Sequence, residues 1–259
     1  MVRQKKYLTH WLWASFLAVA LILLSPSGGK SQSSSIADRL PNLPPPQVHP
    51  LPASLAAWQD KDQSGGYFDQ VTPVEVGYFI WSRFPVRVYV EPAGTDRPSQ
   101  RWTSAVLQAV QDWQAYIPLQ MVQQPEVADI SFGRGGLPIR FSREAKHGPT
   151  GRVRSAETRF ELYTRPDPSS GQPYLWHRAA IRIRPTQTEP YIRAAARHEL
   201  GHALGIWGHS SNAADVMYFS QVRQPPPISA RDMNTLKKVY EQPTSLGWPL
   251  PASTPELKK

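Results

Sequence analysis

The sequence predicts an α+β fold with a mainly parallel, twisted sheet and an antiparallel edge strand. Residues 86–90 alternate valine with Arg or Tyr, the period of two expected of a half-buried strand. Apolar side chains then repeat with helical spacing over residues 102–113. Apolar stretches at 119–122 and 128–132 follow, and this order of strand, helix and strand favours a right-handed crossover between parallel strands.

The helix of this crossover is expected to begin near Pro98 and Ser99. Its apolar stripe indicates one buried face and consists of Trp102, Ala105, Val106, Ala109, Val110 and Trp113. Because tryptophan is the largest apolar side chain, the two tryptophans are expected to anchor the core.

The remaining strands are expected between residues 155 and 184. Residues 133–151 are rich in Gly and Arg and are expected to form a loop. Residues 155–163 alternate in polarity again and are expected to be the edge strand, whose free backbone groups would pair with an extended peptide. A turn at 167–173 then leads to a last strand at 178–184.

Two helices are expected after the sheet. Thr186 or Thr188 can cap the first, which continues to about residue 203. Ser229, with Asp232 three residues later, forms an acidic variant of the capping box for the second helix. The apolar stripe of this second helix should pack behind the histidine motif described below and consists of Met233, Leu236, Val239 and Tyr240.

The first 29 residues have the composition of a targeting segment. Three basic residues precede an apolar run at 11–24, which is shorter than the roughly 20 residues that span a bilayer, and small residues follow it. A signal peptide at 1–29 is therefore the favoured interpretation, and an uncleaved N-terminal membrane anchor is the alternative. Either one predicts a secreted, periplasmic or cell-envelope protein. Only an uncleaved N-terminal segment would contact a membrane.

Four further segments complete the predicted organisation. Residues 30–54 form a Ser- and Pro-rich linker, because proline at this density forces an extended chain. Residues 55–76 are a pro-segment or an N-terminal wrap. Residues 77–247 form the folded domain, and residues 248–259 form a polar, flexible tail.

The composition limits the possible metal ligands and partners. The chain has no cysteine, so a metal has to be bound by His, Asp or Glu. It has 29 Lys and Arg against 20 Asp and Glu, and residues 1–30 hold four of these bases and no acid. The remaining excess is scattered, as at Arg182 and Arg184, which favours a solvated sheet surface over nucleic-acid binding. We expect a monomer without a nucleic-acid partner.

The stretch 198–210 reads His-Glu-Leu-Gly-His-Ala-Leu-Gly-Ile-Trp-Gly-His-Ser. In a helix, His198 and His202 lie about 6 Å apart along the axis and leave the same face, so they can bind one metal. Glu199 can hold the water that the metal would activate, the arrangement of a zinc hydrolase. Gly205 can take the positive φ that ends a helix, and the chain then offers His209 as a third ligand.

Five residues resemble the extended zinc signature of the metzincin metallopeptidases in type and spacing, namely His198, Glu199, His202, Gly205 and His209. Ser210, directly after the third histidine, is similar to the matrixin branch of that family. Met217 stands eight residues past His209, where matrixins have a methionine turn beneath the metal. In some metzincins a tyrosine two residues past this methionine contacts the metal, but that position here is Phe219, so Tyr218 is assigned to structural support, as are Gly205 and Met217.

The resemblance covers roughly residues 77–245 and implies a metzincin-like (zincin) fold with an active-site helix and a C-terminal helix. It implies a zinc metalloendopeptidase of the bacterial matrixin type, which would hydrolyse a peptide or protein substrate. One catalytic Zn²⁺ would be bound by the three histidines, with Glu199 as the general base. Trp207 and residues 218–220 are candidate walls of the specificity pocket.

Two features of matrixins are not expected in this chain. Matrixins often block their zinc with a cysteine, and the lack of cysteine excludes that latency mechanism. Matrixins also carry additional calcium and zinc sites. Acidic and histidine residues between Gly133 and Glu189 are too few and wrongly spaced for a structural Ca²⁺ or a second Zn²⁺.

Two other functions remain open at this stage. A non-catalytic, zinc-stabilised envelope protein could bind peptides through the edge strand, although a purely structural zinc site has no need for Glu199. A zinc hydrolase of cell-wall peptides would use the same residues, because a fold does not settle its substrate.

Overall fold

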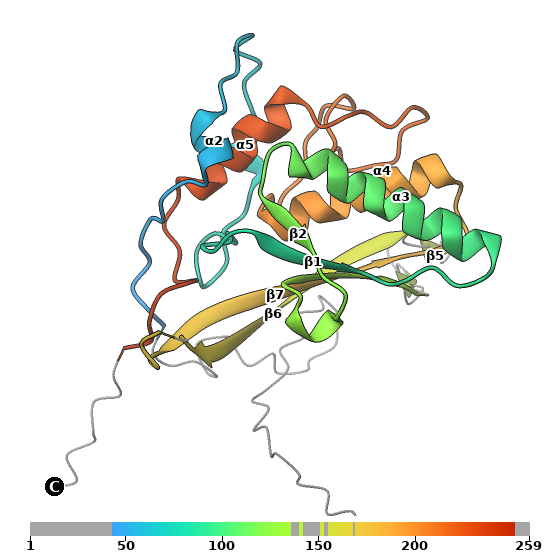
Figure 1. Cartoon of the computed structure of the whole chain (residues 1–259). Helices are drawn as coiled ribbons and strands as arrows, with labels where there is room; N and C mark the ends of the chain where they lie inside the picture. The colour runs from blue at the N-terminus through green and yellow to red at the C-terminus, as the bar shows by residue number, and fades with distance from the viewer. Residues whose placement is uncertain (1–42, 136–139, 142–150, 153–154, 168, 252–259) are drawn as a thin grey trace, which may run out of the picture.

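The computed structural model describes residues 43–135, 140–141, 151–152, 155–167 and 169–251. Five strands form one sheet, with the long helices α3 and α4 against one face (Figure 1). The strands are β1 (Val86–Val90), β2 (Leu119–Met121), β3 (Ile130–Arg134), β6 (Ala156–Pro166) and β7 (Pro173–Ile183). The helices are α2 (Ala53–Ala57), α3 (Arg97–Gln114), α4 (Glu189–Leu204) and α5 (Ala230–Tyr240).

The strand order in the sheet is β2-β1-β3-β7-β6. β2, β1, β3 and β7 run parallel to one another, whereas β6 is antiparallel to β7 and lies at the edge. This confirms the predicted mixed fold with a mainly parallel sheet and an antiparallel edge strand. Within the predicted loop 133–151, β3 continues to Arg134, and the two-residue strands β4 (Arg140–Phe141) and β5 (Gly151–Arg152) pair with each other.

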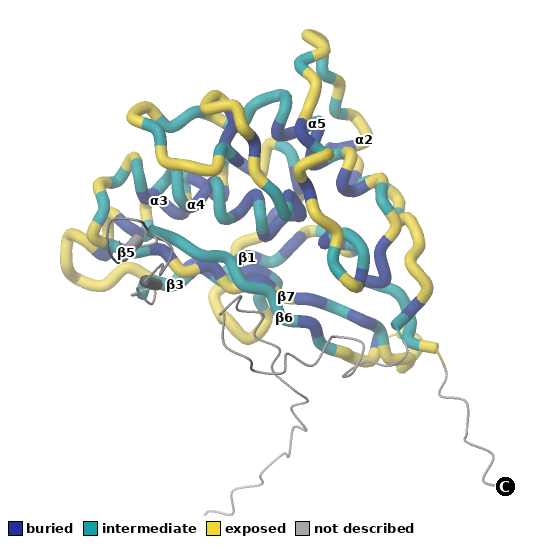
Figure 2. The backbone as a smooth tube through the Cα atoms, turned by 180° about the vertical axis from the view of Figure 1, so that it is seen from behind, coloured by how far each residue is buried: buried dark blue, intermediate teal, exposed yellow. Residues whose placement is uncertain are grey.

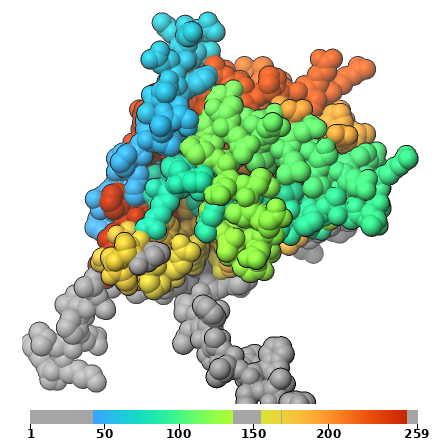
Figure 3. All heavy atoms as spheres, viewed as in Figure 1, coloured from blue at the N-terminus to red at the C-terminus, as the bar shows by residue number. Residues whose placement is uncertain are grey.

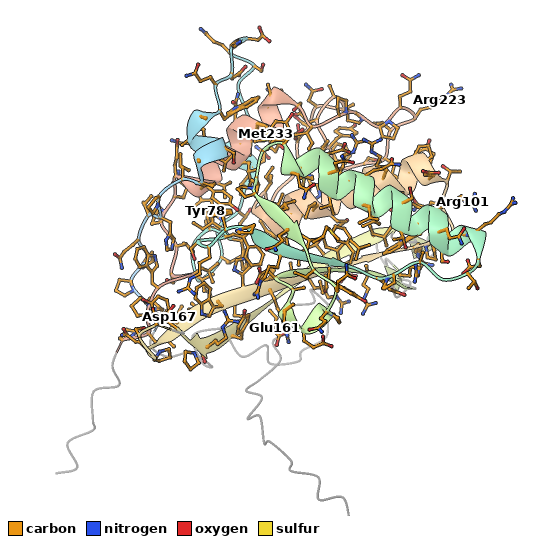
Figure 4. The ribbon with its side chains drawn as sticks, in the orientation of Figure 1. Tyr78, Arg101, Glu161, Asp167, Arg223 and Met233 are labelled. Atoms are coloured by element: carbon orange, nitrogen blue, oxygen red, sulfur yellow. The ribbon has the colours of Figure 1, made fainter. Side chains whose placement is uncertain are left out.

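β6 and β7 are longer than the alternation of polarity predicted. β7 begins at Pro173 instead of residue 178, and β6 ends at Pro166 instead of residue 163. The two strands pair over their whole length, and this long-range pairing extends both of them. Asp167 holds the turn between them, because its carboxylate accepts the backbone N–H of Ser169 at 3.0 Å. Figure 4 shows Asp167 at this turn and Glu161 on β6.

The start of β3 differs slightly from the prediction, whereas α3 begins at Arg97, next to the predicted Pro98 and Ser99. β3 begins at Ile130 instead of residue 128, because a short 3-10 helix at Pro125–Val127 comes directly before it. α3 is capped by Asp96, whose side chain accepts the backbone N–H of Ser99 at 2.8 Å. Asp96 is an ordinary N-cap residue, so its role could have been found from the sequence.

The core lies between the sheet and its helices, where the tube of Figure 2 is coloured as buried. All six residues of the predicted α3 stripe are buried. The predicted α5 stripe is buried as well, and Figure 4 marks Met233 within it. α5 has the complete capping box, in which the side chain and backbone of Ser229 and Asp232 bond reciprocally.

The N-terminal segment, residues 43–76, lies alongside the C-terminal end of the described chain at one side of the molecule (Figure 3). Gln47 and Thr244 exchange both of their backbone hydrogen bonds at 3.0 Å. Leu55, Tyr67 and Val71 are buried in the main core. Residues 43–54 of the predicted linker and residues 55–76 therefore pack against the domain that was expected to begin at Gly77.

The start of the predicted tail also packs against the sheet. Leu175 on β7 donates its backbone N–H to the carbonyl of Trp248 at 3.1 Å, and Leu250 donates to Pro173 at 2.8 Å. The predicted targeting segment, residues 1–29, lies outside the described residues. Among the helices that the structure describes, none is long and apolar enough to cross a membrane.

Candidate metal centre

Three histidines converge at the C-terminal end of α4. His198 and His202 are one helical turn apart on α4, and His209 follows on the loop after the helix. Their candidate ligand atoms all lie within 4.8 Å of one another. Among the described residues this histidine triad is the one group of three or more His or acidic side chains placed to hold a metal ion.

Hydrogen bonds from the backbone orient two of the rings. His198 Nδ1 lies 2.8 Å from the carbonyl oxygen of Val216, and His202 Nδ1 lies 2.7 Å from that of Ile206. A carbonyl only accepts, so each Nδ1 carries the proton and donates it. Nε2 then keeps its lone pair for a metal, and the same pattern fixes metal-binding histidines in other proteins.

The surroundings favour the neutral, metal-binding form of His202 and His209. Burial lowers the pKa of His202 well below its usual value, and the neighbouring His198 and His209 lower it further. Burial also lowers the pKa of His209, with a smaller contribution from His198. Three imidazoles and no thiolate form a donor set that fits zinc and leaves its fourth position open.

Gly205 ends α4 as the sequence predicts. It has a φ of 130°, which L side chains rarely adopt, and its N–H bonds to the carbonyl of His202 at 3.0 Å. A Cβ atom at this position would also overlap with the carbonyl oxygen of Phe79. The sharp turn brings the chain back so that His209 faces the other two histidines.

Met217 packs against α4 at Gly201. Its side chain is fully buried, and a Cβ atom added to Gly201 of α4 would overlap with its sulfur. The loop that carries Met217 also holds the histidines, since the Met217 carbonyl accepts the N–H of Ser210 at 2.8 Å. Tyr218 forms a bridge with Ser210 in the same loop, in keeping with its assignment to structural support.

A buried carboxylate that the sequence analysis identified only as a helix cap also holds this loop. Asp232 is fully buried and accepts the backbone N–H of Val216 at 2.9 Å and that of Met217 at 3.4 Å. Tyr67 donates its hydroxyl to the same carboxylate. Burial and the negative charge of Asp232 raise the pKa of Tyr67, so this hydroxyl stays protonated. Asp232 thus links the start of α5 to the carbonyl that orients His198.

Glu199 lies next to the triad and is oriented by the edge strand. Thr158 on β6 donates its hydroxyl to Glu199 Oε2 at 2.6 Å and lies 3.0 Å from the Glu199 backbone carbonyl. Thr158 is not recognisable from the sequence as a partner of Glu199, since 41 residues separate the two. Its alternating position in β6 was the one local signal that its side chain faces α4.

A cavity of about 1050 Å³ opens in front of these residues. One wall is the start of β6, residues 155–158, and another is the segment 215–222 after His209. Trp207 and residues 218–220, predicted as pocket walls, do line it, and the Phe219 side chain is 61% exposed. The N-terminal segment adds Gln70, Thr72 and Val74 as a wall that the sequence did not predict. Figure 4 labels Arg223, which directly follows the segment 215–222 and points away from the body of the molecule.

The predicted site residues are therefore together in one place, and the site has the parts that a metal-assisted hydrolysis requires: three metal ligands, an oriented carboxylate and an open cavity. The comparison with known proteins adds no relative. No protein-family model matches the chain, and no curated protein matches it in sequence.

Proposed function

We propose that the protein is a zinc-dependent endopeptidase of the matrixin-like metzincin type. The observation that carries the proposal is that Glu199 and the histidine triad line one large cavity, which the edge strand β6 borders. The presence of Glu199 favours a catalytic over a structural metal site. A structural site has no need for this carboxylate and normally closes its fourth position with a protein ligand.

A zinc ion at the triad would lower the pKa of a water molecule toward 7 and polarise the carbonyl to be attacked. Glu199 would accept a proton from the attacking water and would later pass it to the leaving amine. Thr158 holds the Glu199 carboxylate in place through its hydrogen bond. Met217 supports α4 by packing and does not bind the metal.

A peptide substrate suits the shape of the site. β6 pairs with β7 on one side, and no described strand pairs with its other edge. The free backbone groups of that edge can align an extended chain, and residues 155–158 of this region line the cavity. A cavity of about 1050 Å³ is also at the upper end of the range for small-molecule sites. The prediction of a secreted or envelope enzyme rests on residues 1–29.

Cleavage of a denatured protein mixture by the purified protein, with zinc measured in the same sample, tests this proposal. The wild type should bind one zinc per chain and cleave. Glu199→Ala should keep the zinc and lose at least about 100-fold in kcat, because it lacks the base. His209→Ala should lose zinc, because two histidines remain.

Three other results would contradict the proposal. Wild-type protein that holds zinc and cleaves no more than Glu199→Ala would favour the non-catalytic peptide-binding function. Cleavage restricted to cell-wall peptides would favour the cell-wall hydrolase. Undiminished zinc in His209→Ala would remove His209 from the ligand set.

A further inference from the structure

Arg197 brings a buried positive charge to the cavity. It directly precedes His198 on α4, is 8% exposed and lines the same cavity as the histidine triad. Its backbone is fixed, because its carbonyl accepts the indole N–H of Trp113 on α3 at 2.9 Å. A guanidinium remains charged at any pH that a protein tolerates, so this charge is permanent.

The protein itself compensates this charge poorly. Asp112 on α3 forms an ion pair with Arg197, but Asp112 Oδ2 lies 3.5 Å from Arg197 Nε and accepts no hydrogen bond from it. Asp112 is already bound by Arg193, which donates two hydrogen bonds to it at 3.0 and 2.6 Å. One carboxylate therefore serves two guanidiniums, and Arg197 Nε is buried without a hydrogen-bond partner.

Two other carboxylates that line the cavity are paired with other arginines. Glu157 is paired with Arg159, and Asp215 is paired with Arg231. Glu199 accepts the hydroxyl of Thr158 beside the triad. Among the described residues that line the cavity, Arg197 is the one Lys or Arg side chain. A charged donor group in this position is left for a ligand that enters the cavity.

We propose that Arg197 makes the enzyme select peptides with an Asp or Glu side chain close to the scissile bond. This inference rests on the proposed function, since it names the substrate class of the same site. A carboxylate matches the planar fork of a guanidinium, and the pair is strong where water is excluded. This preference concerns substrate binding alone and leaves the positions of the triad and of Glu199 unaffected.

Two synthetic peptide libraries test the proposal with the full-length, zinc-loaded protein. One library contains Asp and Glu, and the other contains Asn and Gln at the same positions. Wild-type protein should cleave the acidic library with a kcat/KM about 10- to 100-fold higher, the range expected of a charge-assisted hydrogen bond. Arg197→Met keeps the length of the side chain without its charge and should abolish the difference.

Arg193→Met is the matched control. Arg193 lies one turn earlier on the same helix and bonds to the same Asp112, but it does not line the cavity. This variant should keep the preference for acidic peptides, whereas a purely structural role of the Asp112 cluster would make both variants behave alike. Arg197→Lys keeps the charge and should keep part of the preference for acidic peptides. This variant tests the role of the charge where Arg197→Met does not fold.

Binding to Glu199→Ala protein separates failure of this inference from failure of the proposed function. Glu199→Ala retains the metal ligands, so it should bind acidic peptides tightly without cleaving them, and Glu199→Ala/Arg197→Met should not. Acid-selective binding by a protein that never cleaves would support Arg197 and contradict the peptidase. Cleavage or binding that does not distinguish the two libraries would overturn the role of Arg197.

Discussion

A single hydroxyl determines how Glu199 is held. Thr158 reaches the carboxylate from a different element, and the contact of 2.6 Å is short enough to fix the rotamer of the glutamate. His198 and His202 are fixed in the same manner by the carbonyls of Val216 and Ile206. At the scale of residues, the chemistry therefore depends on partners that orient the groups and do not react themselves.

Replacement of Thr158 tests this orientation. Thr158→Val has nearly the same shape and lacks the hydroxyl, so we expect kcat to fall by about 10-fold, equivalent to one lost hydrogen bond of about 1.4 kcal/mol, with KM little changed. Thr158→Ser restores the hydroxyl and should recover most of the activity. Zinc content and melting temperature are measured for both variants. A higher KM with an unchanged kcat in Thr158→Val would contradict a positioning role.

At the scale of elements, α4 and the Met217 loop form one unit. The loop bonds to the ring of His198, pairs with Ser210 and packs its sulfur under Gly201. Asp232 at the start of α5 holds the backbone of the same loop. Because each contact joins two elements, a displacement of one element would also displace the candidate metal ligands.

Gly201→Ala tests the contact between α4 and this loop. Alanine is the better helix former, but its Cβ would overlap with the Met217 sulfur, so we expect a loss of about 1–3 kcal/mol in the free energy of unfolding. Zinc affinity should fall as well. Gly135→Ala is the control, because the nearest atom to its added Cβ is 3.9 Å away. Chemical denaturation measures both variants, and equal stability of the two would contradict the tight packing.

At the scale of the whole molecule, the two ends of the described chain complete the domain. Residues 43–76 supply Leu55 to the core and Gln70 to the wall of the cavity. Residues 248–250 continue the pairing at the start of β7. Residues 43–76 thus pack on the domain as a wrap, and a pro-segment at residues 55–76 stays a prediction.

Leu55→Ala measures how much the wrap contributes to stability. Leu55 is fully buried, and truncation of such a leucine costs about 2–5 kcal/mol through lost burial and the cavity that remains. Leu107→Ala on α3 is the control, because Leu107 is 42% exposed and its truncation should cost less than about 0.5 kcal/mol. Thermal unfolding gives both values. A stability of Leu55→Ala equal to that of Leu107→Ala would indicate a segment that the domain does not need.

The features predicted correctly from the sequence depend on neighbours along the chain. The α3 stripe, the capping box at Ser229 and the turn at Gly205 are each determined within a few residues. The spacing of His198 and His202 is fixed by the geometry of one helical turn. These patterns were enough to predict α3, α4 and α5, the edge strand and the three candidate metal ligands, but not α2.

The sequence by itself thus determined the elements and the histidines, because helical period, strand period and turn chemistry act locally. Only the tertiary structure decided which groups surround them. Thr158 meets Glu199 across 41 residues, and Asp232 reaches back to Val216. Arg197 has an insufficient partner because Arg193 occupies Asp112 on another helix. Such contacts result from the packing of separate elements against one core, which no local pattern encodes.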